Sequence, residues 1–264
     1  MCPTPVEPLQ WQADGSPFSP RFGDVYRSRS GALAQAQQVF AGGCGLPPAW
    51  RGRDRFAVLE TGFGLGLNFL TTWALWRRDT ERCQRLRFVS VEAHPVDAAA
   101  LLRSAVSLRP PLPSAQSAAP PASPDDDLAA LIEHLVPALA QAWVDWQAGW
   151  QRWHFDEGRV ELCLGVGDAQ ALLSALPAQA VDAIYLDGFS PAKNPAMWST
   201  ALLAAVARHA VGSTRLATYT VSSAVRRDLA ALGFEVVKVP GLAPKRESLR
   251  AHMTARAQAP TGLD

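Results

Sequence analysis

The chain contains 264 residues, of which 48% are hydrophobic, and this suits one α/β domain with additions or at most two small domains. The formal net charge is only +1, and no uninterrupted apolar stretch is long enough to cross a membrane, so no membrane association is expected. Residues 1–20 lack the basic start and apolar run of a signal peptide, and the four cysteines are scattered without histidines at ligand spacing. We therefore expect a cytoplasmic protein with no metal site.

Residues 1–55 are predicted to form an N-terminal extension that is rich in Gly, Pro, Ser and Arg and contains short strands, for example at 24–26. A repeating strand–helix pattern then occupies 56–256. Within it, 104–127 is predicted as a flexible insertion because its first part is rich in Pro, Ala and Ser, and 257–264 is predicted as a disordered tail. The predicted strands cover residues 56–60, 88–91, 160–166, 181–186, 215–220, 234–239 and about 246–252. The longer helical patterns cover residues 67–77, 128–150, 197–209 and 224–232.

Strands that alternate with helices predict an α/β fold with a parallel, doubly wound sheet and right-handed crossovers. The last two strands are joined by a short loop that contains Pro and Gly, so they are predicted to form an antiparallel hairpin at the edge of the sheet. A set of tryptophans at near-helical intervals is predicted to pack against this sheet, with stacking on RNA as the alternative. These are Trp143, Trp146, Trp150 and Trp153.

The first strand of the repeating pattern leads into a glycine loop, in which residues 60–68 read Glu-Thr-Gly-Phe-Gly-Leu-Gly-Leu-Asn. A nicotinamide fingerprint needs its third glycine three residues after the second, where this chain has Leu67. An acid followed by G-x-G-x-G instead resembles the S-adenosylmethionine motif of class I methyltransferases, whose Rossmann-like, seven-stranded sheet has one reversed strand. Their cofactor has a cationic amino group for a carboxylate to bind, and glycines let the backbone come close to it. The predicted cofactor contacts here are Glu60, Gly62, Phe63, Gly64, Gly66 and Asn68.

Acidic side chains also follow the next strands of the pattern. Glu92 ends the second strand, where an acid can accept hydrogen bonds from both ribose hydroxyls. Gly167 and Asp168 follow the third strand, where such proteins hold the adenine amino group. Each acid alone has a simpler interpretation as a helix cap or a surface residue. Together with the glycine loop, acids at three successive strand ends favour a cofactor site.

The most informative segment is 185–198, which reads Tyr-Leu-Asp-Gly-Phe-Ser-Pro-Ala-Lys-Asn-Pro-Ala-Met-Trp. A buried strand runs directly into Asp187, and ligands of open α/β sheets bind beyond the carboxyl ends of the strands. A helix cap would explain the carboxylate but not the Phe, Lys and Asn-Pro that follow. The segment therefore predicts a binding loop.

Positive charge is unevenly distributed along the chain. Residues 208–256 contain nine Lys or Arg and three Asp or Glu. Segregated positive charge can recruit a polyanion, and solvated helix faces produce similar clusters, so both interpretations stay open. Two further basic clusters are Arg51, Arg53 and Arg55, and Arg77, Arg78, Arg82, Arg85 and Arg87.

From about residue 10 to 253 the chain resembles the methyltransferase half of the bacterial bifunctional tRNA 5-methylaminomethyl-2-thiouridine biosynthesis proteins (the MnmC family), which also occurs as a stand-alone enzyme. The matching segments are 18–26, 39–50, 60–70, 90–95, 186–198, 217–229 and 245–249. Departures from the family pattern include Leu65 and Gly43-Cys44. The other half of the family is flavin-dependent, and no second glycine fingerprint follows Met253. The resemblance therefore implies a stand-alone form or a fragment, with a separate or fused flavin-dependent oxidoreductase domain as partner.

The resemblance implies methyl transfer from S-adenosylmethionine to the amine of 5-aminomethyl(-2-thio)uridine at the tRNA wobble position. Asp187 is the candidate that orients this amine, and the same carboxylate is also a candidate for holding the cofactor's ammonium group. Phe189 and Pro191 would then wall the base, and Asn194 would bind its edge. The residues expected to bind phosphates of the anticodon loop are Lys193, Arg226, Arg227, Lys245 and Arg246. The alternatives are a methyltransferase for a small or protein-borne amine, and a non-catalytic RNA-binding protein of the same fold.

Overall fold

The computed structural model describes residues 6–27, 31–108, 124–143, 146–243 and 246–254. A central sheet of eight strands has the order β10-β11-β9-β8-β4-β5-β7-β6. Strands β4, β5, β7, β8 and β9 pair in parallel, whereas β6 and β11 are antiparallel to their neighbours. The strands are β4 (Arg55–Thr61), β5 (Arg85–Glu92), β6 (Gly149–Phe155), β7 (Val160–Val166), β8 (Val181–Leu186), β9 (Ala210–Thr218), β10 (Phe234–Pro240) and β11 (Glu247–Met253).

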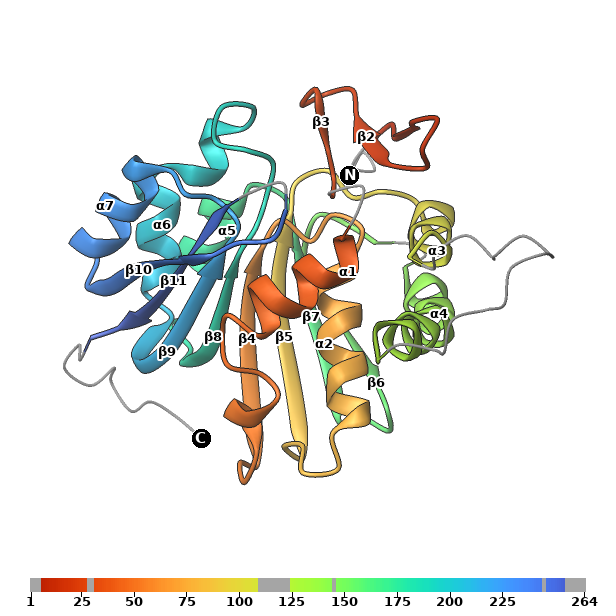
Figure 1. Ribbon diagram of the computed structural model, residues 1–264, viewed down its shortest axis with the longest axis horizontal. Helices are drawn as coiled ribbons and strands as arrows, with labels where there is room; N and C mark the ends of the chain where they lie inside the picture. Colours follow the sequence, from red (N-terminus) through yellow and green to blue (C-terminus); the bar gives the residue numbers. More distant parts are fainter. Residues whose placement is uncertain (1–5, 28–30, 109–123, 144–145, 244–245, 255–264) are drawn as a thin grey trace.

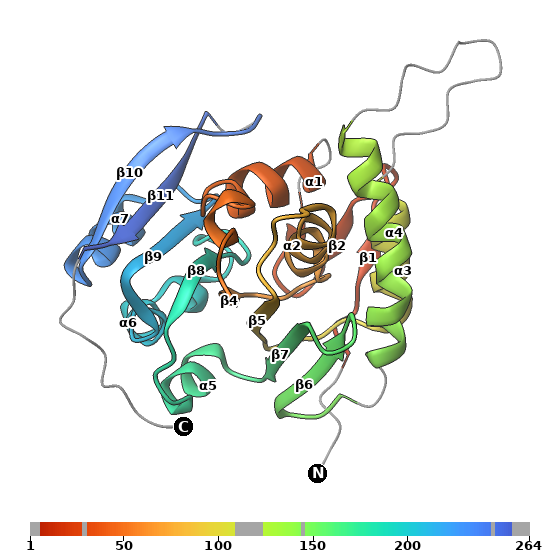
Figure 2. The same cartoon turned by 90° about the horizontal axis from the view of Figure 1, so that it is seen from below.

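Helices cover both faces of this sheet (Figures 1 and 2). One face carries α1 (Ala32–Ala34) with the continuing turn η1 (Gln35–Ala41), α2 (Leu67–Arg78), α3 (Ala98–Val106) and α4 (Pro124–Ala142). The other face carries α5 (Ala169–Ala175), α6 (Thr200–Ala207) and α7 (Ser223–Ala231). Short helical turns occur at η2 (Pro48–Trp50) and η3 (Pro195–Trp198). A small second sheet of β1 (Gln10–Trp11), β2 (Pro17–Ser19) and β3 (Asp24–Val25) precedes the main domain. In the described part of the chain, no helix has both the length and the apolar character that a membrane crossing requires.

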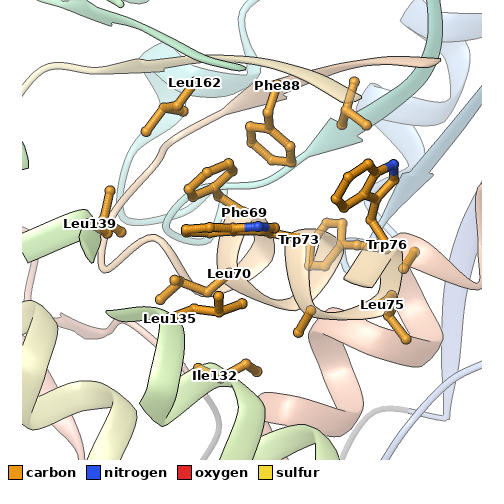
Figure 3. Packing of buried hydrophobic residues seen from close by; sticks show 14 of the residues in the cluster. Phe69, Leu70, Trp73, Leu75, Trp76, Phe88, Ile132, Leu135, Leu139 and Leu162 are labelled. Carbon is orange, nitrogen blue, oxygen red and sulfur yellow. The ribbon is translucent and has the colours of Figure 1, made fainter. Parts of the chain in front are cut away.

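The aromatic core around α2 fixes the helix that begins at the glycine loop (Figure 3). The Phe69 ring lies 5.6 Å from that of Trp73 and 5.3 Å from that of Phe88 on β5, and Trp73 lies 4.7 Å from Phe155 on β6. Phe69 and Phe88 are fully buried, and burial of such a side chain stabilises a fold by about 1.5–3 kcal/mol. The start of α2 is therefore held rigidly against the sheet.

The predicted strands are all present, but the sheet has one strand more than the predicted seven. The helix expected to reach residue 150 ends at Ala142, and β6 follows it. Trp150 and Trp153 lie on this strand and pack against the core clusters on opposite faces of the sheet. Positions three apart face opposite sides of a strand, so their near-helical spacing misled the sequence interpretation.

Two other boundaries differ from the predictions. Residues 104–106 belong to α3 and 124–127 to the first turn of α4, so the expected insertion is shorter than 104–127. Its centre, 109–123, and the predicted tail, 257–264, lie outside the described residues. The N-terminal extension also contains helical structure at 32–41 that its composition did not indicate.

The strand register aligns the carboxyl ends of the parallel strands at one edge. Thr61 pairs with Val91 on β5 and with Leu186 on β8, and Glu92 pairs with Val166 on β7. From β4 the sheet is built outward in both directions, to β5 and β7 on one side and to β8 and β9 on the other. The strand order therefore reverses at β4, which is the position where open α/β sheets bind ligands.

Candidate cofactor and substrate site

A cavity of about 490 Å³ lies over the carboxyl ends of β4, β5, β7 and β8. Residues of β3 and α1 from the N-terminal extension also line it. The structure thus brings together residues predicted from four separate parts of the sequence. The predicted site residues that line the cavity are Gly62, Phe63, Gly64, Asn68, Glu92, Asp168, Asp187, Phe189 and Asn194.

The glycine loop lines the cavity, and neighbouring atoms leave little room for a side chain at two of its glycines. The backbone N–H groups of Gly62 and Phe63 donate to Val91 O at 3.0 and 3.2 Å, which ties the loop to β5. Gly62 has φ 74°, and a Cβ added there would lie 3.2 Å from Asp187 O. At Gly64, with φ 54°, the added Cβ would lie 3.3 Å from the Tyr26 ring. The glycines therefore allow both a left-handed backbone and a close approach of β8 and Tyr26.

Glu92 and Asp168 present carboxylates to the cavity while their orientation is fixed by backbone amides. The Glu92 oxygens accept hydrogen bonds from Gly64 N and His94 N, both at 2.8 Å. Asp168 caps α5 by accepting from Ala171 N at 2.8 Å, so the helix-cap interpretation and a place in the cavity wall both hold for it. Gly167 does not line the cavity, and its N–H joins the ends of β7 and β5 through Glu92 O.

Glu60 was predicted to contact the cofactor directly, but it lies behind the cavity wall. It is 1% exposed, and its oxygens accept from Ser90 Oγ at 2.6 Å and from Asn68 Nδ2 at 3.0 Å. Asn68 Nδ2 also donates to Asp187 Oδ2 at 2.9 Å, so one amide bridges the two acids. Burial is the main cause that raises the pKa of Glu60 well above its usual range, and the charge of Asp187 raises it further.

Asp187 is held firmly at the end of β8. Its backbone exchanges two hydrogen bonds with Thr61 Oγ1, which donates to Asp187 O at 2.8 Å and accepts from Asp187 N at 3.1 Å. Asp187 Oδ1 accepts from Gly188 N at 2.8 Å. The cap of the following helix, α6, is Ser199, whose Oγ accepts from Leu202 N. Asp187 therefore does not act as the helix cap of the simpler interpretation.

An aromatic cluster continues the cavity wall beyond Asp187. The Phe189 ring stacks on Phe22 at 4.6 Å and meets Tyr26 edge-on at 4.9 Å. The N-terminal extension is also joined to this loop by Ser190 N, which donates to Asp24 Oδ2 at 3.2 Å. Burial, with the negative charge of Glu92, raises the pKa of Tyr26. Phe22 and Tyr26 were not predicted as site residues, although both lie in the matching segment 18–26.

The remaining predicted residues lie around the rim or away from the cavity. Gly66 begins α2 in a left-handed conformation, and Pro191 and Lys193 follow Phe189 in the β8–α6 connection. Arg226 and Arg227 lie in the first half of α7, and Arg246 immediately precedes β11. Because α7 follows β9 and β11 is antiparallel to β9, these arginines lie toward the same edge of the sheet as the cavity. Lys245 lies outside the described residues.

The two other basic clusters lie on the side of the sheet where the parallel strands begin, opposite the cavity. Arg53 Nη1 pairs with Asp182 Oδ1 at 2.7 Å, and Arg51 Nε pairs with Asp79 Oδ2 at 3.1 Å. Arg77 Nε likewise donates to Asp156 at 3.0 Å. These side chains are neutralised by carboxylates and are remote from the carboxyl ends of the strands. The solvated, ion-paired interpretation therefore holds for them.

Comparisons with known proteins agree with this geometry. Residues 130–254 match the family model for S-adenosyl-L-methionine-dependent methyltransferases. The bifunctional tRNA 5-methylaminomethyl-2-thiouridine biosynthesis protein MnmC of Acidovorax sp. (strain JS42) is 50% identical over 250 residues, which are 95% of this chain and 36% of that protein. Its counterpart from Ralstonia nicotianae is 51% identical over 238 residues, 90% of this chain and 33% of that protein. The chain thus spans about a third of the length of these relatives.

The crystal structure of MNMC2 from Aquifex aeolicus has the same fold, with a TM-score of 0.65 at 22% identity, over 95% of this chain and 72% of that one. The fold, the glycine loop and the match of residues 130–254 to the family model all correspond to S-adenosyl-L-methionine-dependent methyltransferases. Within that class the chain is a relative of the bifunctional MnmC proteins, as the resemblance in the sequence predicted. S-Adenosyl-L-methionine is the methyl donor of this class.

Proposed function

We propose that the chain methylates the primary amine of 5-aminomethyl(-2-thio)uridine at the wobble position of tRNA. The relatives' name describes biosynthesis of the methylaminomethyl product, and the similarity extends over nearly the whole chain. The observation that carries the proposal is Asp187, a carboxylate fixed between the glycine loop and an aromatic wall in the same cavity. A separate or fused oxidoreductase domain is proposed as its functional partner, since the relatives are bifunctional and much longer.

The cavity fits S-adenosylmethionine by the chemistry of its donors and acceptors. Glu92 would accept from ribose hydroxyls, and Asp168 would accept from the adenine amino group. The backbone of Gly62 and Gly64 would lie against the methionine part, because both glycines line the cavity. Glu60 would contribute indirectly through Asn68, since it does not line the cavity. When bound, the cofactor supplies a methyl group that is already activated by a sulfonium.

Asp187 has the position and the rigidity to prepare an amine nucleophile. A free alkylamine is mostly protonated near pH 7, as the lysine reference pKa of about 10.4 indicates, and only the neutral form has a lone pair to donate. Asp187 would accept a hydrogen bond from the neutral amine and so orient its lone pair. Its two oxygens are anchored by Gly188 N and by Asn68 Nδ2, so this alignment costs little reorganisation. The same carboxylate is close enough to the glycine loop to share duty with the cofactor's ammonium group.

The tRNA would approach from the carboxyl edge of the sheet. Phe189, backed by Phe22, offers a flat apolar surface for an unstacked uracil, and Asn194 in the cavity wall would bind its edge. Pro191 and Lys193 would flank the base, with Arg226, Arg227, Lys245 and Arg246 toward the phosphates. Among the described residues, Arg226, Arg227 and Arg246 have no carboxylate partner within an ion-pair distance.

The test is transfer of labelled methyl groups to tRNA from a strain that lacks this modification. Asp187→Asn preserves the size of the side chain, and we expect kcat to fall by roughly 10²–10⁴-fold, the usual contribution of a general base. Asp54→Asn, at the opposite edge of the sheet, is the matched control. Calorimetric measurement of cofactor affinity separates the two proposed roles of Asp187. If Asp187→Asn weakens cofactor binding by the same factor by which it slows the reaction, Asp187 serves the cofactor alone. Full activity of Asp187→Asn would refute the catalytic assignment.

A further inference from the structure

Arg27 is a cavity residue that neither the sequence motifs nor the resemblance indicated. It follows β3, and among the described residues that line the cavity it is the only lysine or arginine. Its guanidinium is anchored through Nη2, which donates to Ser104 O at 3.2 Å and to Ser107 Oγ at the end of α3. The side chain is therefore held in a defined position rather than extended into solvent.

The charge of Arg27 is not balanced by the protein. Nε is buried and has no hydrogen-bond partner within the described part of the chain, and no ion pair there involves Arg27. Burial lowers the pKa of Arg27 to about 10, and no carboxylate offsets this effect. A partly desolvated guanidinium without a counter-ion is unfavourable, so such a group in a cavity wall indicates a site for an anion.

The location of Arg27 relates this anion site to the glycine loop. Arg27 directly follows Tyr26, whose ring lies 3.3 Å from the Cβ position of Gly64. The cavity acids are accounted for differently: Glu92 and Asp168 are bound to backbone amides, and Asp187 is bound to Gly188 N and Asn68. The cavity thus offers acceptors for hydroxyl and amino groups along the strand ends, and a fixed cation in the part of its wall that the N-terminal extension supplies.

We propose that Arg27 binds the carboxylate of the methionine part of S-adenosylmethionine. This inference rests on the proposed function, because it assumes that this cofactor occupies the cavity. The cofactor's amino-acid end carries both an ammonium and a carboxylate, so the acids of the wall can satisfy the first but not the second. A planar guanidinium with free N–H groups is suited to a carboxylate, and Ser104 and Ser107 hold it in position.

The experiment is a binding cycle by isothermal titration calorimetry with S-adenosylmethionine and its decarboxylated analogue, which lacks only the carboxylate. For Arg27→Gln we expect the Kd of S-adenosylmethionine to rise by about 10–100-fold, as for the loss of a hydrogen-bonded charge pair, while the Kd of the analogue stays within about 3-fold. The unchanged protein should prefer S-adenosylmethionine to the analogue by the same factor. Arg103→Gln is the matched control, since Arg103 stacks on Trp11 and does not line the cavity.

The outcomes separate the assignments. If S-adenosylmethionine and its analogue both bind more weakly to Arg27→Gln by the same factor, Arg27 has a structural role and the proposal is overturned. Where the glutamine variant folds poorly, the affinities of the two ligands are compared in Arg27→Lys, which keeps the charge. Unchanged cofactor binding with a raised KM for tRNA would assign Arg27 to a substrate phosphate and overturn it as well. If the unchanged protein binds neither ligand, the proposed function itself fails, and this result is distinct from the other two.

Discussion

Replacement of Glu60 by glutamine should make the protein more stable at neutral and alkaline pH. Glu60 is 1% exposed and accepts hydrogen bonds from Ser90 Oγ and Asn68 Nδ2. Glutamine has nearly the same shape and mimics the protonated acid. Its carbonyl oxygen can accept from Asn68, and its amide can donate to Ser90 Oγ. The variant therefore keeps the packing and removes a carboxyl group whose ionised form is disfavoured by burial.

The sign and the size of the effect follow from proton linkage. Burial raises the folded-state pKa of Glu60 well above the ordinary value of 4.5. Above pH 4.5 the folded chain therefore holds a proton that the unfolded chain has released, and stability falls as the pH rises toward the folded-state pKa. One proton corresponds to a change of about 1.4 kcal/mol in the free energy of unfolding per pH unit. The variant does not lose this stability as the pH rises, because it has no carboxyl group at position 60. For a chain of this size, the difference between the melting temperatures should widen by roughly 3–6 °C per pH unit.

The assay is thermal unfolding of both proteins from pH 4.5 to 8, with Glu157→Gln as a control that removes an exposed carboxyl. The two curves should coincide near pH 4.5 and diverge above it. A constant difference across this range would refute the linkage argument. Calorimetric titration with S-adenosylmethionine adds a second check, because Glu60→Gln should leave the Kd within about 3-fold if Glu60 acts only through Asn68. A tenfold rise in the Kd would mean that Glu60 contacts the cofactor directly, as the sequence predicted.

Two further predictions concern the walls of the cavity. Gly62→Ala should raise the Kd of S-adenosylmethionine at least about tenfold in calorimetry, because the new Cβ would lie 3.2 Å from Asp187 O in a left-handed backbone. Gly52→Ala, at φ 69° with open space around it, isolates the backbone strain, and an equal loss of affinity there would contradict the close-approach argument. Phe22→Ala should raise KM for tRNA by about 5–100-fold through the loss of stacking on Phe189 and the base, with an unchanged cofactor Kd. A shift of the cofactor Kd instead would assign Phe22 to the cofactor.

Local signals in the sequence were sufficient for seven of the eight strands of the sheet and for the acids at their carboxyl ends. The positions of Glu92, Asp168 and Asp187 follow from strand ends, because parallel strands bring their carboxyl ends together. Long-range packing was not predictable in the same way. Nothing in the segment 22–27 indicates that Phe22 stacks on Phe189 or that Arg27 reaches α3, since these contacts depend on how the extension folds over the sheet.

The position of Glu60 illustrates a second limit of prediction from the sequence. Strand periodicity gives the face of the sheet on which a side chain lies, and the motif gives its distance from the glycines along the chain. Neither indicates that Asn68, eight residues later, occupies the space between Glu60 and the cavity. The same applies to β6, where tryptophan spacing fits a helix until the side chains are known to pack on opposite faces of the sheet.

The distribution of paired and unpaired arginines leads to the last prediction. Arg53 and Arg77 are neutralised by Asp182 and Asp156 at the edge opposite the cavity, whereas Arg226 and Arg227 have no carboxylate partner among the described residues. Counterion release depends on charges that phosphates can replace, so Arg226→Ser/Arg227→Ser should weaken tRNA binding and lower the slope of log K against log salt by about 1.4 for two contacts to single-stranded phosphates. Arg53→Gln/Arg77→Gln removes the same charge and should leave the slope unchanged. Equal slopes for the two double variants would mean that net charge, rather than the cavity edge, guides the tRNA.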